Sequence, residues 1–185
     1  MIERLKGIFP ALLTPFDKNG KINEKALESL IEMNISKNVS GFYVSGSTAE
    51  AFLLTEQERK YLYSLTKEIV GNRKPLIAHV GAISTEQAIE YAKIAQKEGY
   101  DAISSVAPFY FKFSVEEIKQ YYFDIVNSVS LPMIVYNIPA FSGVSMSMET
   151  LGEFLTDKRF IGVKHTSNDF FALNNYCFQL FATAE

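Results

Sequence analysis

The sequence predicts an α/β fold in which short buried strands alternate with amphipathic helices. Six short apolar runs recur at intervals of 34, 34, 27, 30 and 28 residues, and helical patterns fill the gaps between them. Repeated βα units of this kind form parallel sheets with right-handed crossovers. No linker or charge run divides the 185 residues, so we expect a single domain spanning residues 1–185.

The six apolar runs are the expected strands. Each contains four to seven residues, which is too short for a buried helix and typical of a strand buried on both faces. The runs begin at Gly7, Gly41, Pro75, Ala102, Pro132 and Phe160.

Three of the expected helices share the same start signal. A hydroxyl residue is followed three positions later by Glu or Gln, the spacing of a capping box. Further helices are expected over residues 25–37, from about 147 to 155, and from near 169. The three boxes are Thr55 to Glu58, Ser84 to Gln87, and Ser114 to Glu117.

Composition and charge indicate which kinds of partner to exclude and which cellular compartment to expect. The net charge of −3 and the pI of about 5.5 imply no basic face, so nucleic acid is not an expected partner. One cysteine, Cys177, excludes a disulfide framework and a cysteine-based zinc site. No stretch approaches the ~18 unbroken apolar residues of a membrane helix. We therefore expect a cytoplasmic protein with no membrane partner.

Two architectures fit the βα repeat. A doubly wound open sheet would be complete at this length, whereas a TIM (β/α)8 barrel, typically ~250 residues, would have only about six of its units. Nothing resembles the GxGxxG or GxxxxGK[ST] loops, which removes support for a nucleotide-binding doubly wound sheet.

The carboxyl ends of the expected strands hold the candidate chemistry. Lys164 ends an apolar strand, where partial desolvation favours a neutral amine able to form a Schiff base. Tyr136 ends the preceding strand, and a parallel neighbour would place its phenol beside Lys164 as a proton shuttle. The competing interpretation is that both are ordinary solvent-exposed strand ends.

Other polar residues carry weaker signals. The loop Gly46-Ser47-Thr48 has backbone N–H groups and hydroxyls that fit a carboxylate, although such loops are also common turns. His79 and His165 are expected to be packed, hydrogen-bonded residues, with His165 pointing away from Lys164, and not metal ligands. The pairs Tyr121-Tyr122 and Phe170-Phe171 are interpreted as helix core.

At these residues the chain resembles the pyruvate-dependent class I aldolases, the family that includes dihydrodipicolinate synthase and N-acetylneuraminate lyase. The resemblance runs from Gly7 to about Leu173. Within the family the motifs look most like those of the lyases. The segments that carry this likeness are Gly46-Ser47-Thr48, Ala107-Pro108-Phe109-Tyr110, Tyr136-Asn137-Ile138-Pro139-Ala140-Phe141-Ser142-Gly143 and Val163-Lys164-His165-Thr166-Ser167.

The resemblance implies a fold, a reaction and a set of roles. It implies a TIM barrel and reversible cleavage of N-acetylneuraminate, a sialic acid, to N-acetylmannosamine and pyruvate. Pyruvate would be held covalently on Lys164, so no metal or other cofactor is implied. The family is usually homotetrameric. The implied roles are Schiff base for Lys164, proton shuttle for Tyr136, carboxylate binding for Ser47 and Thr48, hydroxyl-network support for Tyr110, and sugar contact for Thr166.

The sequence departs from the family in two places. Ala49 stands where the family usually has glycine, which would strain the loop if its φ were positive. The chain also ends in the sixth βα unit, and the segment from Asn174 to Glu185 differs from the family's usual helix. Because the chain looks truncated relative to the family, two alternatives to the lyase function stay open. One is another pyruvate aldolase of the family, either a dihydrodipicolinate synthase or a 2-keto-3-deoxy sugar acid aldolase. The other is an inactive remnant that acts as an interaction module.

Overall fold

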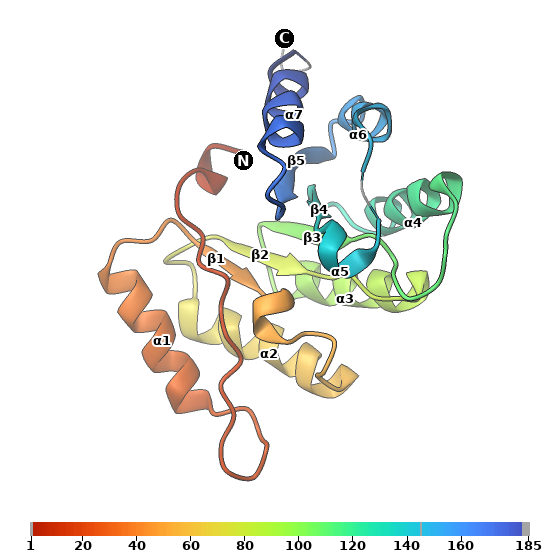
Figure 1. The fold of residues 1–185 in the computed structure, drawn as a ribbon. Helices are drawn as coiled ribbons and strands as arrows, with labels where there is room; N and C mark the ends of the chain where they lie inside the picture. The colour runs from red at the N-terminus through yellow and green to blue at the C-terminus, as the bar shows by residue number, and fades with distance from the viewer. Residues whose placement is uncertain (1, 145, 183–185) are drawn as a thin grey trace. The chain divides into compact units, whose positions relative to one another are not determined.

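The computed structural model describes residues 2–144 and 146–182 (Figure 1). Within it the chain forms two compact units. The first contains residues up to 79 together with 91–103, and the second contains residues 80–90 together with those from 104 onward. The strand order follows the chain, β1-β2-β3 in the first unit and β3-β4-β5 in the second. The division falls inside β3, so both units share that strand.

The first unit is built on two parallel strands and their helices. Strands β1 and β2 pair from Phe42 opposite Leu76 to Val44 opposite Ala78. Fully buried Leu27 and Ile31 of α1 belong to its core. Its elements are the 3-10 helix η1 (Ile2–Leu5), α1 (Glu24–Ser36), β1 (Phe42–Val44), the 3-10 helix η2 (Ser47–Ala49), α2 (Glu56–Val70) and β2 (Leu76–His79). Helix α3 (Thr85–Lys97) and strand β3 (Ala102–Val106) are divided between the units.

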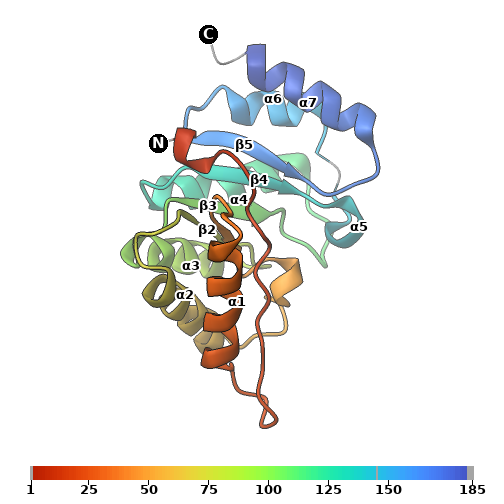
Figure 2. The same cartoon turned by 90° about the vertical axis from the view of Figure 1, so that its left-hand side faces the viewer.

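The second unit carries the later strands. Strands β4 and β5 lie side by side and parallel, and α6 and α7 both contact β5 (Figure 2). Its complete elements are α4 (Val115–Ser128), β4 (Met133–Asn137), α5 (Pro139–Ser142), α6 (Met148–Leu155), β5 (Phe160–His165) and α7 (Phe170–Ala182). The short helix α5 follows Pro139, whose fixed φ suits the first helical position.

The first apolar run is the one place where the strand prediction is wrong. Residues 7–13 make only a single parallel bridge, between Ala11 and Tyr43, and do not form a strand. The N–H of Leu12 donates to the carbonyl of Tyr43 at 2.9 Å, while Pro10 lacks an N–H to extend the ladder. The first of the six predicted strands is therefore an extended segment beside β1, and the described residues contain five strands.

The predicted helix starts are largely confirmed. Thr55 and Ser114 each form a complete capping box, with Glu58 and Glu117 bonding back to the cap backbone. At α3 the hydroxyl of Ser84 accepts from the N–H of Gln87 at 3.3 Å, but it donates to the carboxylate of Glu86. At α3 the carboxylate that contacts the cap residue is therefore that of Glu86, two positions after Ser84, and it accepts from the cap hydroxyl.

An aromatic cluster fills the core of the second unit. The rings of Phe154 and Phe160 stack at 4.9 Å, and Tyr122 lies 5.1 Å from Phe154. Tyr121 and Tyr122 are buried, which confirms their assignment to the core.

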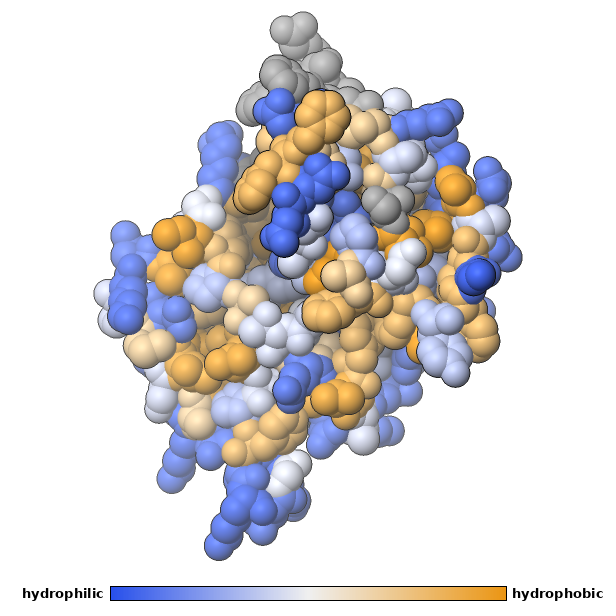
Figure 3. Space-filling model, viewed as in Figure 1, coloured by the Kyte–Doolittle hydropathy of each residue, from blue (hydrophilic) through white to orange (hydrophobic). Residues whose placement is uncertain are grey.

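The core prediction for Phe170 and Phe171 is wrong, because these side chains are 74 % and 77 % exposed. They occupy adjacent positions in the first turn of α7, whereas the buried Tyr176 lies further along this helix. Apolar side chains interrupt the polar surface on the face shown in Figure 3.

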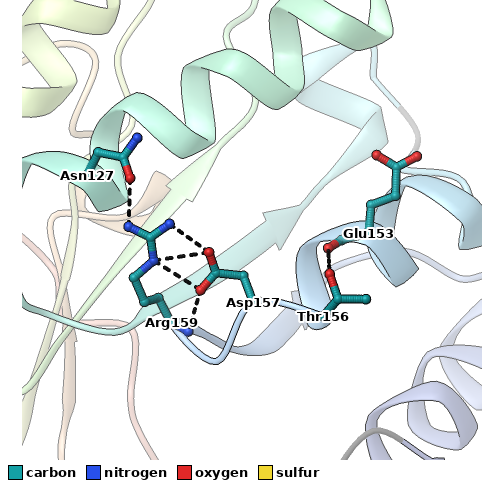
Figure 4. A network of polar contacts seen from close by, with 5 residues as sticks. All are labelled: Asn127, Glu153, Thr156, Asp157 and Arg159. Atoms are coloured by element: carbon teal, nitrogen blue, oxygen red, sulfur yellow. Dashed lines mark hydrogen bonds and ion pairs between the residues drawn. The ribbon is translucent and has the colours of Figure 1, made fainter.

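Polar contacts fix the entry into β5 (Figure 4). Arg159 makes a forked contact with Asp157, at 2.6 Å from Nη2 to Oδ2, and its Nη1 donates to Oδ1 of Asn127 in α4 at 2.7 Å. The Arg159 guanidinium holds the pKa of the Asp157 carboxyl below its usual range. The carbonyl of Arg159 accepts from the N–H of Met133, so the start of β5 is tied to the start of β4.

The capping box of α2 gives a stability prediction. Replacing Thr55 by Ala removes the acceptor for the N–H of Glu58, and we expect a loss of about 1 kcal/mol in the free energy of unfolding. Urea unfolding followed by circular dichroism measures it. The matched control is Gln57→Ala, an exposed position in the same helical turn; an equal effect of both substitutions would contradict the cap.

Candidate active site

Lys164 and Tyr136 form the centre of the candidate site. They are registered partners across β4 and β5, so their side chains share one face of the sheet. The Nζ atom of Lys164 lies 3.5 Å from the centroid of the Tyr136 ring. Tyr136 is only 4 % exposed, whereas Lys164 is half-buried. The predicted juxtaposition is therefore present in the structure, with the amine over the face of the ring.

A bulge in β5 creates this pairing. Met133 lies opposite Phe160, but the next residue of β4, Ile134, lies opposite Gly162. One residue of β5, Ile161, is thus extra, as in a β-bulge. Without it, Tyr136 would face Val163 and the side chain of Lys164 would lie on the other face of the sheet.

Thr166 and a hollow extend the site beyond the amine. The Nζ of Lys164 donates to Oγ1 of Thr166 at 3.0 Å. A hollow of about 390 Å³ is lined by Ala140, Thr166, Ser167 and Asn168. Sequence reasoning identified Thr166 but missed Ser167 and Asn168, although three successive polar residues directly after a buried strand are a signal for a polar subsite.

Tyr110 belongs to the same unit. Its side chain is 84 % exposed, its φ of +77° lies in the left-handed region, and its ring meets Phe111 edge-on at 4.9 Å. A tyrosine in this backbone conformation is strained unless its surroundings hold it.

Ser47 and Thr48 lie in the first unit, in the 3-10 turn η2 after β1. Ser47 is half-buried and Thr48 is exposed. The hydroxyl of Thr14 donates to the carbonyl of Ala49 at 2.8 Å and anchors the turn. Positive φ angles occur at Ser45 (59°) and Glu50 (56°) but not at Ala49. The alanine in the usual glycine position therefore brings no left-handed strain.

A buried arginine supports this turn, and no pattern in the sequence indicated its burial. Arg59 of α2 is 2 % exposed and stacks on the Tyr91 ring, with its guanidinium carbon 4.2 Å from the centroid. Its Nε donates to Oγ of Ser45 at 3.0 Å and its Nη2 to the carbonyl of His79 at 2.6 Å. Since Ser45 immediately precedes Gly46, the arginine fixes the start of the turn.

Both histidines are packed and hydrogen-bonded, as predicted. His79 is fully buried, with Nδ1 2.9 Å from the carbonyl of Ser45. His165 lies on the opposite side of β5 from Lys164, where its ring meets Tyr176 at 5.3 Å.

Among the described residues no group of three or more His, Cys, Asp or Glu side chains is placed to hold a metal ion. In the same residues no helix is long and apolar enough to cross a membrane.

With this fold and this lysine site, the chain belongs to the Dihydrodipicolinate synthetase family, whose sequence profile matches residues 4–181. The α/β fold is that of the TIM-barrel proteins in this family, which confirms the expected fold class.

Solved structures place the chain near the N-acetylneuraminate lyases. It is 48 % identical to CdNal from Clostridium difficile, solved with mannosamine (TM-score 0.89, covering 91 % of this chain and 59 % of that one). It is 41 % identical to N-acetylneuraminate lyase from Fusobacterium nucleatum (TM-score 0.88, covering 94 % and 60 %). It is 27 % identical to YagE of E. coli K12, solved with pyruvate (TM-score 0.92, covering 95 % and 59 %). The chain thus spans about three fifths of the length of these relatives.

The loop that carries Ser47 and Thr48 gives a second stability prediction. A Cβ at Gly46 would meet Cε1 of the buried Tyr43 at 2.7 Å, so the ring would have to shift. We expect Gly46→Ala to lower the free energy of unfolding by about 1–3 kcal/mol. The control is Gly162→Ala, where a Cβ meets nothing within 4 Å, and it should change stability by less than about 0.5 kcal/mol. Urea midpoints that do not differ between the two variants would refute the crowding argument.

Proposed function

We propose that this chain carries the chemistry of a class I pyruvate aldolase and that its reaction is reversible cleavage of N-acetylneuraminate to N-acetylmannosamine and pyruvate. The observation that carries the proposal is the amine of Lys164 over the ring of Tyr136 at the carboxyl ends of β4 and β5. Identities of 41 % and 48 % to solved lyases support the choice of reaction within the family.

In the cleavage direction, Lys164 attacks the 2-keto carbon of the open-chain sugar acid, and loss of water gives a protonated imine. Tyr136 gives its proton to the departing water and then, as the phenolate, removes the proton from the hydroxyl on the β carbon. The bond between the α and β carbons breaks, its electron pair passes into the imine, and the aldehyde N-acetylmannosamine departs. Protonation of the resulting enamine and hydrolysis then release pyruvate and restore the amine. The imine itself is the electron sink, so the proposed mechanism uses no metal or other cofactor.

The remaining candidate residues bind and orient. Ser47 and Thr48 hold the carboxylate of pyruvate with hydroxyl and backbone N–H groups at η2. Thr48 relays protons toward Tyr136, and Tyr110 supports this hydroxyl network. Thr166 contacts the sugar, since it lines the hollow next to Lys164. We further propose that the two units form one barrel-type domain, and that the protein acts in the cytoplasm as a homotetramer.

Trapping with borohydride tests the Schiff base directly. Reduction in the presence of pyruvate should leave a stable adduct on Lys164, read by intact mass and peptide mapping, because hydride reduces only a formed imine. We expect Lys164→Ala to abolish the adduct. The exposed Lys158→Ala should retain it and serves as the matched control.

An adduct that persists in Lys164→Ala would refute the lysine assignment. A folded sample of the unmodified chain that forms no adduct would favour the alternative of an inactive interaction module. Circular dichroism on each sample establishes that it is folded.

Product analysis with a panel of aldehydes tests the substrate. In the condensation direction with pyruvate, N-acetylmannosamine should be consumed faster than aspartate semialdehyde or unsubstituted sugar aldehydes. The physical reason is that Phe141, 76 % exposed in α5, offers no positive charge to a second carboxylate. Preference for aspartate semialdehyde would instead assign the synthase reaction, and preference for simpler sugar aldehydes would assign a 2-keto-3-deoxy sugar acid aldolase.

A further inference from the structure

A polar network lies on the side of β4 and β5 that faces away from the proposed chemistry. Asn137 and His165 are the registered pair that follows Tyr136 and Lys164, so their side chains point to the opposite face. Asn137 is 2 % exposed, and its Nδ2 lies 3.3 Å from Nδ1 of His165 and 3.2 Å from the hydroxyl of Tyr176 in α7. One buried amide therefore links β4, β5 and α7.

The donors and acceptors of this network fit only one arrangement of hydrogens. Tyr176 donates to the carbonyl of Met146 at 3.0 Å and so accepts from the Asn137 amide. The other amide hydrogen goes to Nδ1 of His165, which leaves Nε2–H to donate to the carbonyl of Asp169 at 3.2 Å. The Asn137 oxygen accepts from the N–H of Met146. Loss of one member leaves a buried polar partner unsatisfied.

The same asparagine also reaches the neighbours of the amine through its backbone. Its carbonyl accepts from the N–H of Thr166 at 2.9 Å, and the Thr166 hydroxyl accepts from Nζ of Lys164. Asn137 thus binds the end of β5 in two ways. Its side chain contacts His165, the last residue of the strand, and its carbonyl accepts from Thr166, the next residue. These two contacts lie at the residues that directly follow Lys164.

We propose that Asn137, His165 and Tyr176 are positioning residues that hold the amine of Lys164 over the ring of Tyr136. The inference rests on the proposed function for its chemical meaning. The geometry itself is measurable without any reaction.

The first measurement is an NMR shift on the full chain labelled with ¹³C in lysine. The ε-methylene protons of Lys164, assigned by comparison with Lys164→Arg, should be displaced upfield by the ring current of Tyr136. Asn137→Asp keeps the size and the acceptor but loses both amide donors, and Tyr176→Phe loses only a hydroxyl. We expect both to remove most of the displacement. His165→Gln, whose amide both accepts and donates, should retain it, as should Cys177→Ala, an exposed neighbour of Tyr176.

The second measurement is the rate of borohydride trapping with pyruvate. Asn137→Asp and Tyr176→Phe should trap more slowly by up to about 100-fold, the cost of misplacing a reacting group by ~1 Å. The pyruvate concentration that gives half the maximal rate should not change, because Ser47 and Thr48 are untouched. Circular dichroism monitors folding, and Tyr176→Phe carries the test if Asn137→Asp does not fold.

The outcomes separate the two proposals. An upfield resonance that is present in the unmodified chain and lost in Asn137→Asp and Tyr176→Phe, without any pyruvate adduct, supports the positioning network and overturns the proposed function. Wild-type shifts in folded Asn137→Asp and Tyr176→Phe overturn the positioning network, whatever the trapping shows. Equal losses in these variants and in Cys177→Ala also overturn it, because the effect would then be a general loss of stability.

Discussion

The register between β4 and β5 is the constraint on which the rest of the site depends. Side chains alternate between the two faces of a strand, so a slip of one residue would move Lys164 to the side of α7. The extra residue Ile161 sets the register that puts Lys164 opposite Tyr136. A single irregular position, and not the length or apolarity of either strand, therefore decides whether the amine and the phenol meet.

That register is held at both ends of the strand pair. At the entry, Arg159 joins Asp157 to Asn127, and its carbonyl binds Met133, while Phe160 stacks on the aromatic core. The lowered pKa of Asp157 means that its contribution to stability is present above the unfolded pKa and is lost as the pH falls through the folded value. At the exit, neutral hydrogen bonds replace the ion pair.

Sequence patterns predicted what depends on local chemistry. Apolar runs located the five strands that the described residues contain, capping residues located three of the helix starts, and the pairing expected of neighbouring parallel strands placed Tyr136 beside Lys164. What they missed depends on tertiary context. Gly162 within the run from residue 160 to 164 is compatible with a bulge but does not show which residue is extra, and a charged residue such as Arg59 within a helix is normally on a solvated face. Asn137 ends β4, and its contact with Tyr176, 39 positions later, is visible only in the structure.

The proposed chemistry lies on one face of the β4–β5 pair and the supporting hydrogen-bond network on the other. Residue 165 belongs to the supporting face but directly follows Lys164. The effect of an acidic residue at position 165 follows from the hydrogen bonds of His165. A carboxylate there would accept from the Asn137 amide but could not donate to the carbonyl of Asp169, as the imidazole Nε2–H does. The carbonyl of Asp169, which also accepts from the N–H of Leu173, would lose its bond to residue 165. The segment 166–168, which lines the hollow, lies between these two residues, so the hydrogen bond from His165 to Asp169 joins its two ends.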